Sequence, residues 1–153
     1  MDAKLRSKKP DVDLDLLPAL VGYQLRLAQI AIFRDFSSTL GELNITPGLF
    51  GVLVIIDANS GLTQNALAKA THLDRSTVVT VIDKLEQRGL VERRAAVPDR
   101  RAYALVLTTA GTKLLKRLKT LVQEHEKRLC KNLTVTQRDQ LVHLLQQIFP
   151  ELR

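Results

Sequence analysis

Small hydroxyl side chains and positive charges gather in the helical pattern over residues 74–88. At about 100° per residue, one face of such a helix carries the polar side chains Ser76, Thr80, Asp83, Lys84 and Gln87, with Thr77 at its edge. The opposite face carries the apolar side chains Val78, Val81, Ile82 and Leu85. Hydroxyl groups donate and accept hydrogen bonds, and threonine methyls can contact thymine, so the polar face could read base edges. An ordinary solvated helix face has the same pattern, and both interpretations stay open on this evidence.

Positive charge also dominates the predicted β-hairpin that follows this helix. Only Glu92 and Asp99 oppose the arginines Arg88, Arg93, Arg94, Arg100 and Arg101. Arginine at a hairpin tip suits the narrow minor groove of DNA, where negative potential is concentrated. Asp99 either pairs with a neighbouring arginine or is a simple turn residue after Pro98. The hairpin makes DNA the favoured partner of the helix, and Arg75 in the first helical turn is then expected near a phosphate.

The elements that must position these residues are predicted from capping residues and apolar periodicity. Helices are expected to start after Thr46, Thr63, Asp74 and Thr108 or Thr109, and Gly89 is expected to close the third of them. Two helices joined by a short turn match a helix-turn-helix. Alternation over 90–94 and 102–107 predicts the two strands of a hairpin, the wing of a winged helix-turn-helix.

Long helical patterns flank this lobe. One runs from about Asp15 to Leu43, with Pro18 in its expected first turn, and such long helices are commonly shared between subunits. On the other side, Thr134 and Gln137 form a capping box for a last helix that ends at Pro150. The predicted fold class is mainly α with a small β-hairpin.

Composition narrows the functional classes. The chain has 153 residues and a net charge of +7, which favours a polyanionic partner, while hydrophobic residues make up 45% and supply an ample core. Cys130 is the single cysteine, the histidines are scattered, and no site for a metal or cofactor is predicted. No run approaches the ~20 apolar residues of a membrane span, so a cytoplasmic protein without membrane contact is expected. The glycines form no phosphate-binding motif, and an enzyme is not expected.

Several short motifs between Leu62 and Gly111 resemble the MarR family of bacterial transcription regulators. They comprise Leu67-Ala68, Asp74 with Ser76-Thr77-Val78, Asp83 with Leu85, Gly89-Leu90-Val91 with Arg93, Asp99 with Arg101, and Leu107-Thr108 with Gly111. The resemblance covers about a third of the chain. It implies a homodimer on a palindromic operator in double-stranded DNA, with recognition helices in successive major grooves and wings in the flanking minor grooves.

The resemblance also assigns residues. It implies that Ser76, Thr77 and Thr80 face the groove and that Asp99 and Arg101 form the wing pair, with Arg100 as an added cation. Arg75 and Lys84 are assigned to DNA by wheel geometry alone. The predicted organisation is a flexible basic tail over 1–13, a helical dimerisation region over 14–45 and 109–153, and a winged helix-turn-helix DNA-binding lobe over 46–108.

Control by a small molecule is a further implication of the resemblance. Such regulators usually bind an aromatic ligand, and the candidate residues here are Tyr23, Arg26, Phe33, Arg34, Phe50 and Asp57. Three segments, residues 22–29, 57–64 and 99–108, resemble a subgroup that responds to aromatic acids or hydroxycinnamoyl-CoA-type thioesters. An ion pair is the alternative role for Arg26 and for Arg34.

The resulting prediction is a homodimeric repressor released from its operator by an aromatic ligand or an aryl-CoA thioester. Two alternatives stay open: a regulator that senses oxidants through Cys130, and a winged-helix module that binds protein. The basic wing argues against the second alternative. The sequence leaves open the operator, the effector, whether binding represses or activates, and the role of the basic tail.

Overall fold

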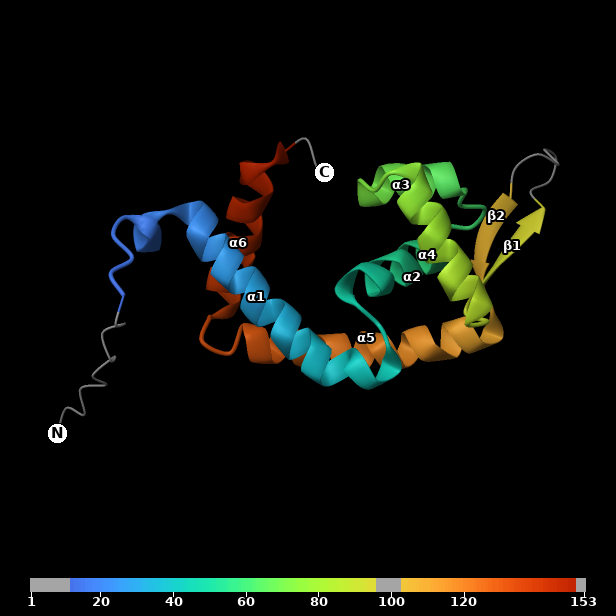
Figure 1. The fold of residues 1–153 in the computed structure, drawn as a ribbon. Coiled ribbons are helices and arrows are strands. Elements are labelled where there is room, and N and C mark those ends of the chain that lie inside the picture. Colours follow the sequence, from blue (N-terminus) through green and yellow to red (C-terminus); the bar gives the residue numbers. More distant parts are fainter. Residues whose placement is uncertain (1–11, 96–102, 151–153) are drawn as a thin grey trace. The chain divides into compact units, whose positions relative to one another are not determined.

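A computed structural model describes residues 12–95 and 103–150 (Figure 1). The candidate wing residues Asp99, Arg100 and Arg101 lie outside the described residues. In chain order the elements are η1 Leu17–Ala19, α1 Val21–Leu40, η2 Gly41–Leu43, α2 Pro47–Ala58, α3 Gln64–Thr71, α4 Arg75–Gln87, β1 Val91–Ala95, β2 Tyr103–Leu107, α5 Thr109–Leu129 and α6 Val135–Ile148. The predicted class, mainly α with one β-hairpin, is confirmed.

The chain divides into two compact units, Met1–Arg34 and Asp35–Arg153. In the first unit the prediction of one helix starting at Asp15 is wrong. Pro18 lies in the short 3-10 turn η1, and Leu20 has an extended backbone, so α1 begins at Val21. The side chain of Gln24 donates to the carbonyl of Pro18 at 2.7 Å and so satisfies one acceptor left free by this break.

Side-chain caps start the helices of the second unit as predicted. The hydroxyls of Thr46, Thr63 and Thr108 accept from the backbone amides that start α2, α3 and α5. Asp74 caps α4 in the same way, and Thr134 with Gln137 forms the complete capping box of α6. The last helix ends at Ile148 rather than at Pro150.

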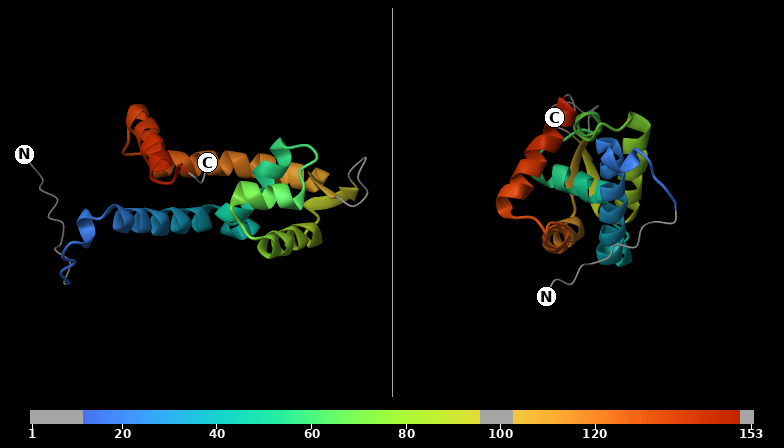
Figure 2. Two further views of the ribbon diagram at one scale, coloured as in Figure 1. Left: turned by 90° about the horizontal axis from the view of Figure 1, so that it is seen from above. Right: turned by 90° about the vertical axis from the view of Figure 1, so that its left-hand side faces the viewer.

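The core of the second unit joins the end of α1, α2, α3, α4, the hairpin and the first half of α5. Its fully buried side chains include Leu53, Leu67, Ile82, Leu85, Leu105 and Leu118. Because α3 and α4 both contribute to this core, they lie side by side, and the hairpin continues from the end of α4 (Figure 2). The helix-turn-helix is therefore held by packing along its whole inner face.

Both strands of the hairpin are fixed where they leave the core. They are antiparallel, with Val91 opposite Leu107 and Ala95 opposite Tyr103. The amide of Leu105 donates to the carbonyl of Leu62 at 2.7 Å, which ties β2 to the chain ahead of α3. Gly89 adopts a left-handed backbone with φ of 66°, as expected for the residue that closes α4.

No single helix in the described residues is long and apolar enough to cross a membrane, although α1 with η2 and α2 would be by length and composition if taken as one bent pair. The apolar side chains of α2, however, include Val52, Leu53 and Ile56, which are buried in the core.

Candidate nucleic-acid interface

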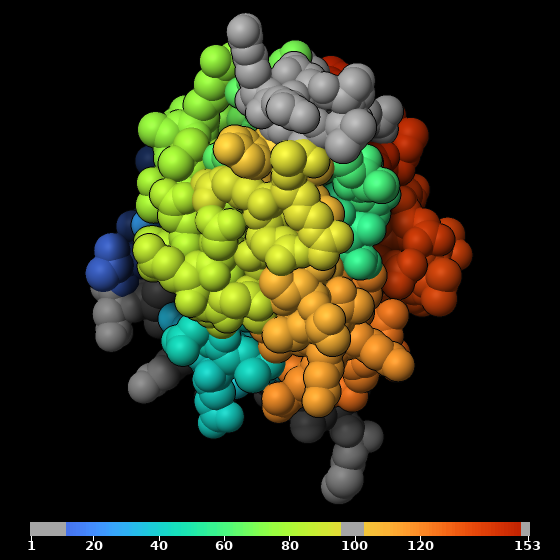
Figure 3. Space-filling view, turned by 90° about the vertical axis from the view of Figure 1, so that its right-hand side faces the viewer, coloured from blue at the N-terminus to red at the C-terminus, as the bar shows by residue number. Residues whose placement is uncertain are grey.

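The outer face of α4 is the exposed polar surface that the helical wheel predicts. Val78, Ile82 and Leu85 are buried, and Val81 is half-buried. The opposite side is exposed and carries Arg75, Ser76, Thr80, Asp83 and Lys84, whereas Thr77 is half-buried at the edge. Atoms of α4 adjoin those of β1 in the space-filling view (Figure 3). A rigid helix thus presents small hydroxyl residues at one end and a lysine near the other.

Hydrogen bonds within the first turn decide what these hydroxyls can offer to a partner. The Ser76 and Thr77 hydroxyls donate to the two carboxylate oxygens of Asp74, at 2.5 and 2.6 Å. The Thr80 hydroxyl donates to the backbone carbonyl of Ser76 at 3.1 Å. Because their hydrogens point to these internal acceptors, the three side chains present lone pairs and, for threonine, methyl groups to the outside.

The Asp74 carboxylate holds this arrangement together. Hydrogen bonds from the hydroxyls of Ser76 and Thr77, and from the Thr77 amide, hold the pKa of Asp74 well below its usual range. The carboxylate therefore remains ionised, and remains a hydrogen-bond acceptor, at neutral and mildly acidic pH. Asp74 orients the two hydroxyls in addition to capping the helix.

The arginines that precede the wing tip do not form the free basic cluster expected from the sequence. Arg93 pairs with Asp83 and Glu86 of α4, and Arg94 pairs with Glu92. Arg88 donates through its two terminal nitrogens to the carbonyls of Leu43 and Asn44, both at 2.9 Å. Three of the five arginines thus have intramolecular partners. The sequence did not reveal these partners, because spacing along the chain does not show which acceptors the fold brings near.

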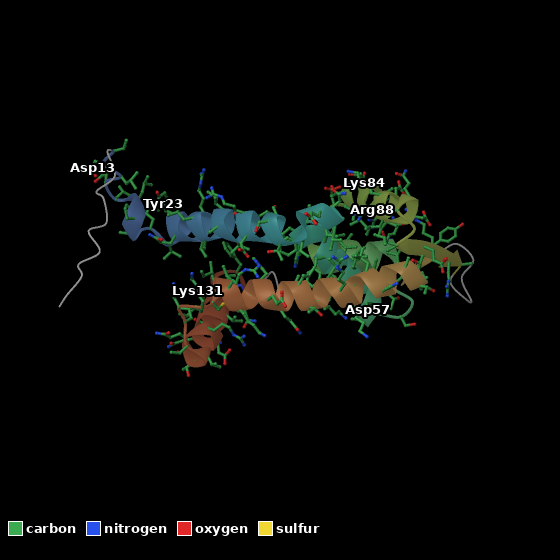
Figure 4. All side chains as sticks on the ribbon, turned by 90° about the horizontal axis from the view of Figure 1, so that it is seen from below. Asp13, Tyr23, Asp57, Lys84, Arg88 and Lys131 are labelled. Carbon is green, nitrogen blue, oxygen red and sulfur yellow. The ribbon has the colours of Figure 1, made fainter. Side chains whose placement is uncertain are left out.

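Arg75 and Lys84 lie on the exposed face of α4, and their contact with DNA stays a prediction. Both are exposed, and neither takes part in an ion pair in the described part of the chain. Lys84 lies on α4, one turn before the C-cap residue Arg88 (Figure 4). Two unpaired cations therefore accompany the hydroxyl residues on the exposed surface.

The six candidate effector residues are distributed over both compact units. Tyr23 is half-buried, and the other three in the unit Met1–Arg34 are exposed: Arg26, Phe33 and Arg34. Phe50 packs partly against the core of the other unit. Asp57 pairs with Lys119 at 2.8 Å and lies near the end of α2 (Figure 4). A common site formed by these residues stays a prediction.

Cys130 and His125 occupy different surroundings on α5. Cys130 is partly buried at the end of the helix and borders a groove of about 470 Å³ with Lys127 and Arg138. His125 is buried against the edge of Phe36, and its Nδ1 lies 2.5 Å from the Asp35 carboxylate. Hydrogen bonds to His125 and Arg128 lower the pKa of Asp35. A redox role for Cys130 stays a prediction.

The chain is similar to known proteins in sequence and in structure. The model of the MarR family matches residues 43–102. A putative transcriptional regulatory protein for the hcr operon of Thauera aromatica is 38% identical over 130 residues, which cover 84% of this chain and 78% of that protein. This chain belongs to the MarR family. It is a DNA-binding transcriptional regulator, as the resemblance implied.

Solved structures of a related repressor agree with this assignment. The repressor CouR bound to a 23-mer DNA duplex has a TM-score of 0.85 and 37% identity, covering 90% of this chain and 98% of CouR. CouR bound to p-coumaroyl-CoA gives a TM-score of 0.82 and 36% identity, covering 90% and 97%. Among the described residues of this MarR-family chain, no group of three or more His, Cys, Asp or Glu could hold a metal ion.

Sequence reasoning missed the ion pairs that support the interface. Asp83 and Glu86 are one helical turn apart, so both can reach a residue packed beside α4. Arg93 is the residue that meets them, across the tight turn at Gly89. In the sequence, these ion pairs were indicated by two acidic residues at positions i and i+3, followed by a strand with basic residues. The register of the hairpin was needed to show which arginine pairs with the two carboxylates.

Proposed function

We propose that this regulator is a homodimeric repressor that binds a palindromic operator. The α4 helices lie in successive major grooves, and the wings lie in the flanking minor grooves. The observation that carries the proposal is the outer face of α4, which has exposed hydroxyls at its start and the unpaired cations Arg75 and Lys84. The likeness to CouR bound to a DNA duplex supports it.

Apolar surface on the long helices supports a second copy of the chain as the partner. α6 has no buried residue, although it carries a stripe of apolar side chains. These side chains are 40–52% exposed: Leu141, Leu144, Leu145 and Ile148. On α1, Leu27, Ile30 and Phe33 are 43–47% exposed. Apolar faces of this extent are stabilised by burial against another helix. Sedimentation equilibrium should therefore give twice the chain mass of 17.1 kDa.

Thr80 is proposed to contribute to base reading, and its replacement by alanine should change sequence preference. The hydroxyl of Thr80 donates inward, so it can accept from a base amino group, while its methyl can contact thymine. Thr80→Ala is expected to relax selection at one base pair in each half-site, in affinities measured over single-base operator variants.

Two further variants separate the chemistry of Thr80. Thr80→Val keeps a methyl and removes the hydroxyl, whereas Thr80→Ser keeps the hydroxyl and removes the methyl. If Thr80→Ala discriminates among the variants as the unchanged protein does, the assignment of Thr80 to base reading is wrong.

The proposed effector class is an aromatic acid or its coenzyme A thioester. The structure of CouR with p-coumaroyl-CoA supports this class. Such a ligand releases DNA when it binds better to a dimer whose recognition helices are misplaced for successive grooves. The operator is first obtained by selection from a random duplex library and labelled. Addition of p-coumaroyl-CoA to its complex with the protein should then lower the fluorescence anisotropy of the labelled operator.

Controls in the same titration separate the parts of the ligand. Free p-coumarate tests the acid alone, and coenzyme A tests the nucleotide alone. Release by the thioester but not by coenzyme A supports an aryl-CoA effector. A complex that no aromatic acid or acyl-CoA ester dissociates would contradict the effector class, while leaving the DNA-binding part of the proposal intact.

A further inference from the structure

Arg93 extends from β1 to side chains of two helices. Its Nη2 pairs with Oδ1 of Asp83 at 2.6 Å, and its Nη1 pairs with Oε2 of Glu86. Its Nε donates to Oε1 of Gln64, in the first turn of α3, at 3.1 Å. The backbone amide of Arg93 also donates to Oε1 of Glu86 at 3.2 Å. One side chain thus connects α3, α4 and β1, all within the compact unit Asp35–Arg153.

Arginine is the only side chain whose geometry fits these partners. Each of the three guanidinium nitrogens donates to a different residue, and a lysine ammonium, a single point charge, cannot span three acceptors in one plane. The Arg93 side chain is only 20% exposed. Burial alone would lower the pKa of Arg93, but the hydrogen bond to Asp83 and the charge of Glu86 outweigh it and raise that pKa.

Gln64 shows how strongly this arrangement is constrained. Because Arg93 can only donate, the carbonyl oxygen of the Gln64 amide must face it. The amide nitrogen, Nε2, is then buried and has no hydrogen-bond partner among the described residues. A buried unpaired N–H is unfavourable, so the contact with Arg93 must outweigh that loss.

The charges in this cluster do not suit direct binding of phosphate. Asp83 and Glu86 carry two negative charges against the single positive charge of Arg93, and Asp83 is exposed on the outer face of α4. A carboxylate on that face opposes the approach of DNA. The role of this cluster must therefore lie within the protein, in the elements that its contacts hold in place.

We propose that Arg93 is a positioning residue, which together with Asp83, Glu86 and Gln64 fixes the angle between the hairpin and α4. The inference rests on the proposed function, because it makes this angle the determinant of whether wing and recognition helix reach adjacent grooves together. Arg93 itself contacts no DNA. Its role is to couple the two DNA-contacting elements of each subunit.

Asp83→Asn tests the proposal because electrostatics and positioning predict opposite results. Removal of a negative charge from the DNA-facing side should tighten binding if charge alone matters. Loss of the ion pair should instead weaken binding to the selected operator by about tenfold, while affinity for a scrambled duplex stays the same or rises. Both affinities are measured by anisotropy at fixed salt with the full-length dimer.

Glu92→Gln is the matched control. It removes the same charge from β1, where Glu92 pairs with Arg94 and, among the described residues, forms no ion pair with α3 or α4. Both duplexes should bind Glu92→Gln as tightly as the unchanged protein or more tightly. If Asp83→Asn tightens binding to both duplexes in the same way, the positioning role is overturned.

Arg93→Lys provides a second readout that does not depend on the stability of Asp83→Asn. It keeps the positive charge but loses the three-way contact. The loss of operator affinity caused by Arg101→Ala should therefore be smaller in the Arg93→Lys protein than in the unchanged protein. A double-mutant cycle of Arg93→Lys with Arg101→Ala measures that coupling. Strictly additive losses would contradict the inference. The proposed function would instead be contradicted if neither Arg101→Ala nor Thr80→Ala, made in the unchanged protein, altered operator binding.

Discussion

Arg101→Ala is expected to weaken operator binding by roughly 100-fold while leaving the dimer intact. Arg101 lies outside the described residues, and its role rests on the family motif and on the position of the hairpin beside α4. A hydrogen bond to a charged group contributes about 1.5 kcal/mol or more. A dimer places one wing on each half-site, so about 3 kcal/mol is lost, which corresponds to the expected change in Kd.

Arg138→Ala separates the contribution of the wing from that of net charge. Arg138 is exposed on α6, and its replacement removes the same charge from each subunit. Operator affinity should change little in Arg138→Ala, and the slope of log affinity against log salt should fall only in Arg101→Ala. Equal losses in the two variants would show that Arg101 acts through the overall charge of the protein.

Gly111→Ala is expected to destabilise the fold by about 1–3 kcal/mol, the usual cost of overpacking a core. A Cβ at Gly111 would lie 2.0 Å from the carbonyl oxygen of Leu90 and 2.9 Å from its carbonyl carbon. These atoms belong to the backbone between α4 and β1, where the Thr108 amide also donates to the Leu90 carbonyl. The backbone must shift, and the hairpin with it, so operator affinity should fall as well as the urea midpoint.

Gly51→Ala is the control for the general effect of replacing glycine in a helix. Gly51 lies inside α2, and a Cβ there would meet nothing within 4 Å. Because alanine loses less backbone entropy than glycine, this variant should be more stable by about 0.5–1 kcal/mol. A Gly111→Ala protein as stable as Gly51→Ala would show that the α5 start can move away from Leu90 without loss.

The sequence predicted most of the DNA-binding lobe because its signals are local. A capping side chain acts within one helical turn, so Thr46, Thr63 and Asp74 mark the starts of α2, α3 and α4 without knowledge of the rest of the fold. Apolar periodicity likewise separated the buried from the exposed face of α4. The break at Leu20 was missed because Pro18 is also tolerated in the first turn of a helix.

Only the tertiary structure decided which charges remain for a partner. From the sequence, the charged residues at 88, 93 and 94 formed one basic group together with the wing tip. The fold pairs Arg93 with carboxylates on α4 and directs Arg88 to backbone carbonyls far away in the sequence. Such partners meet through packing, so no local pattern predicts them.

The hydroxyl face on α4 was thus determined by the sequence, because helical periodicity sets which side chains share a face. The direction of its hydrogen bonds was decided by the structure, through the position of Asp74. The same holds for the hairpin: alternation predicted its strands, but only the structure shows that Arg93 of β1 contacts three side chains of α3 and α4. Contacts between elements depend on distances in space, which the order of residues alone does not specify.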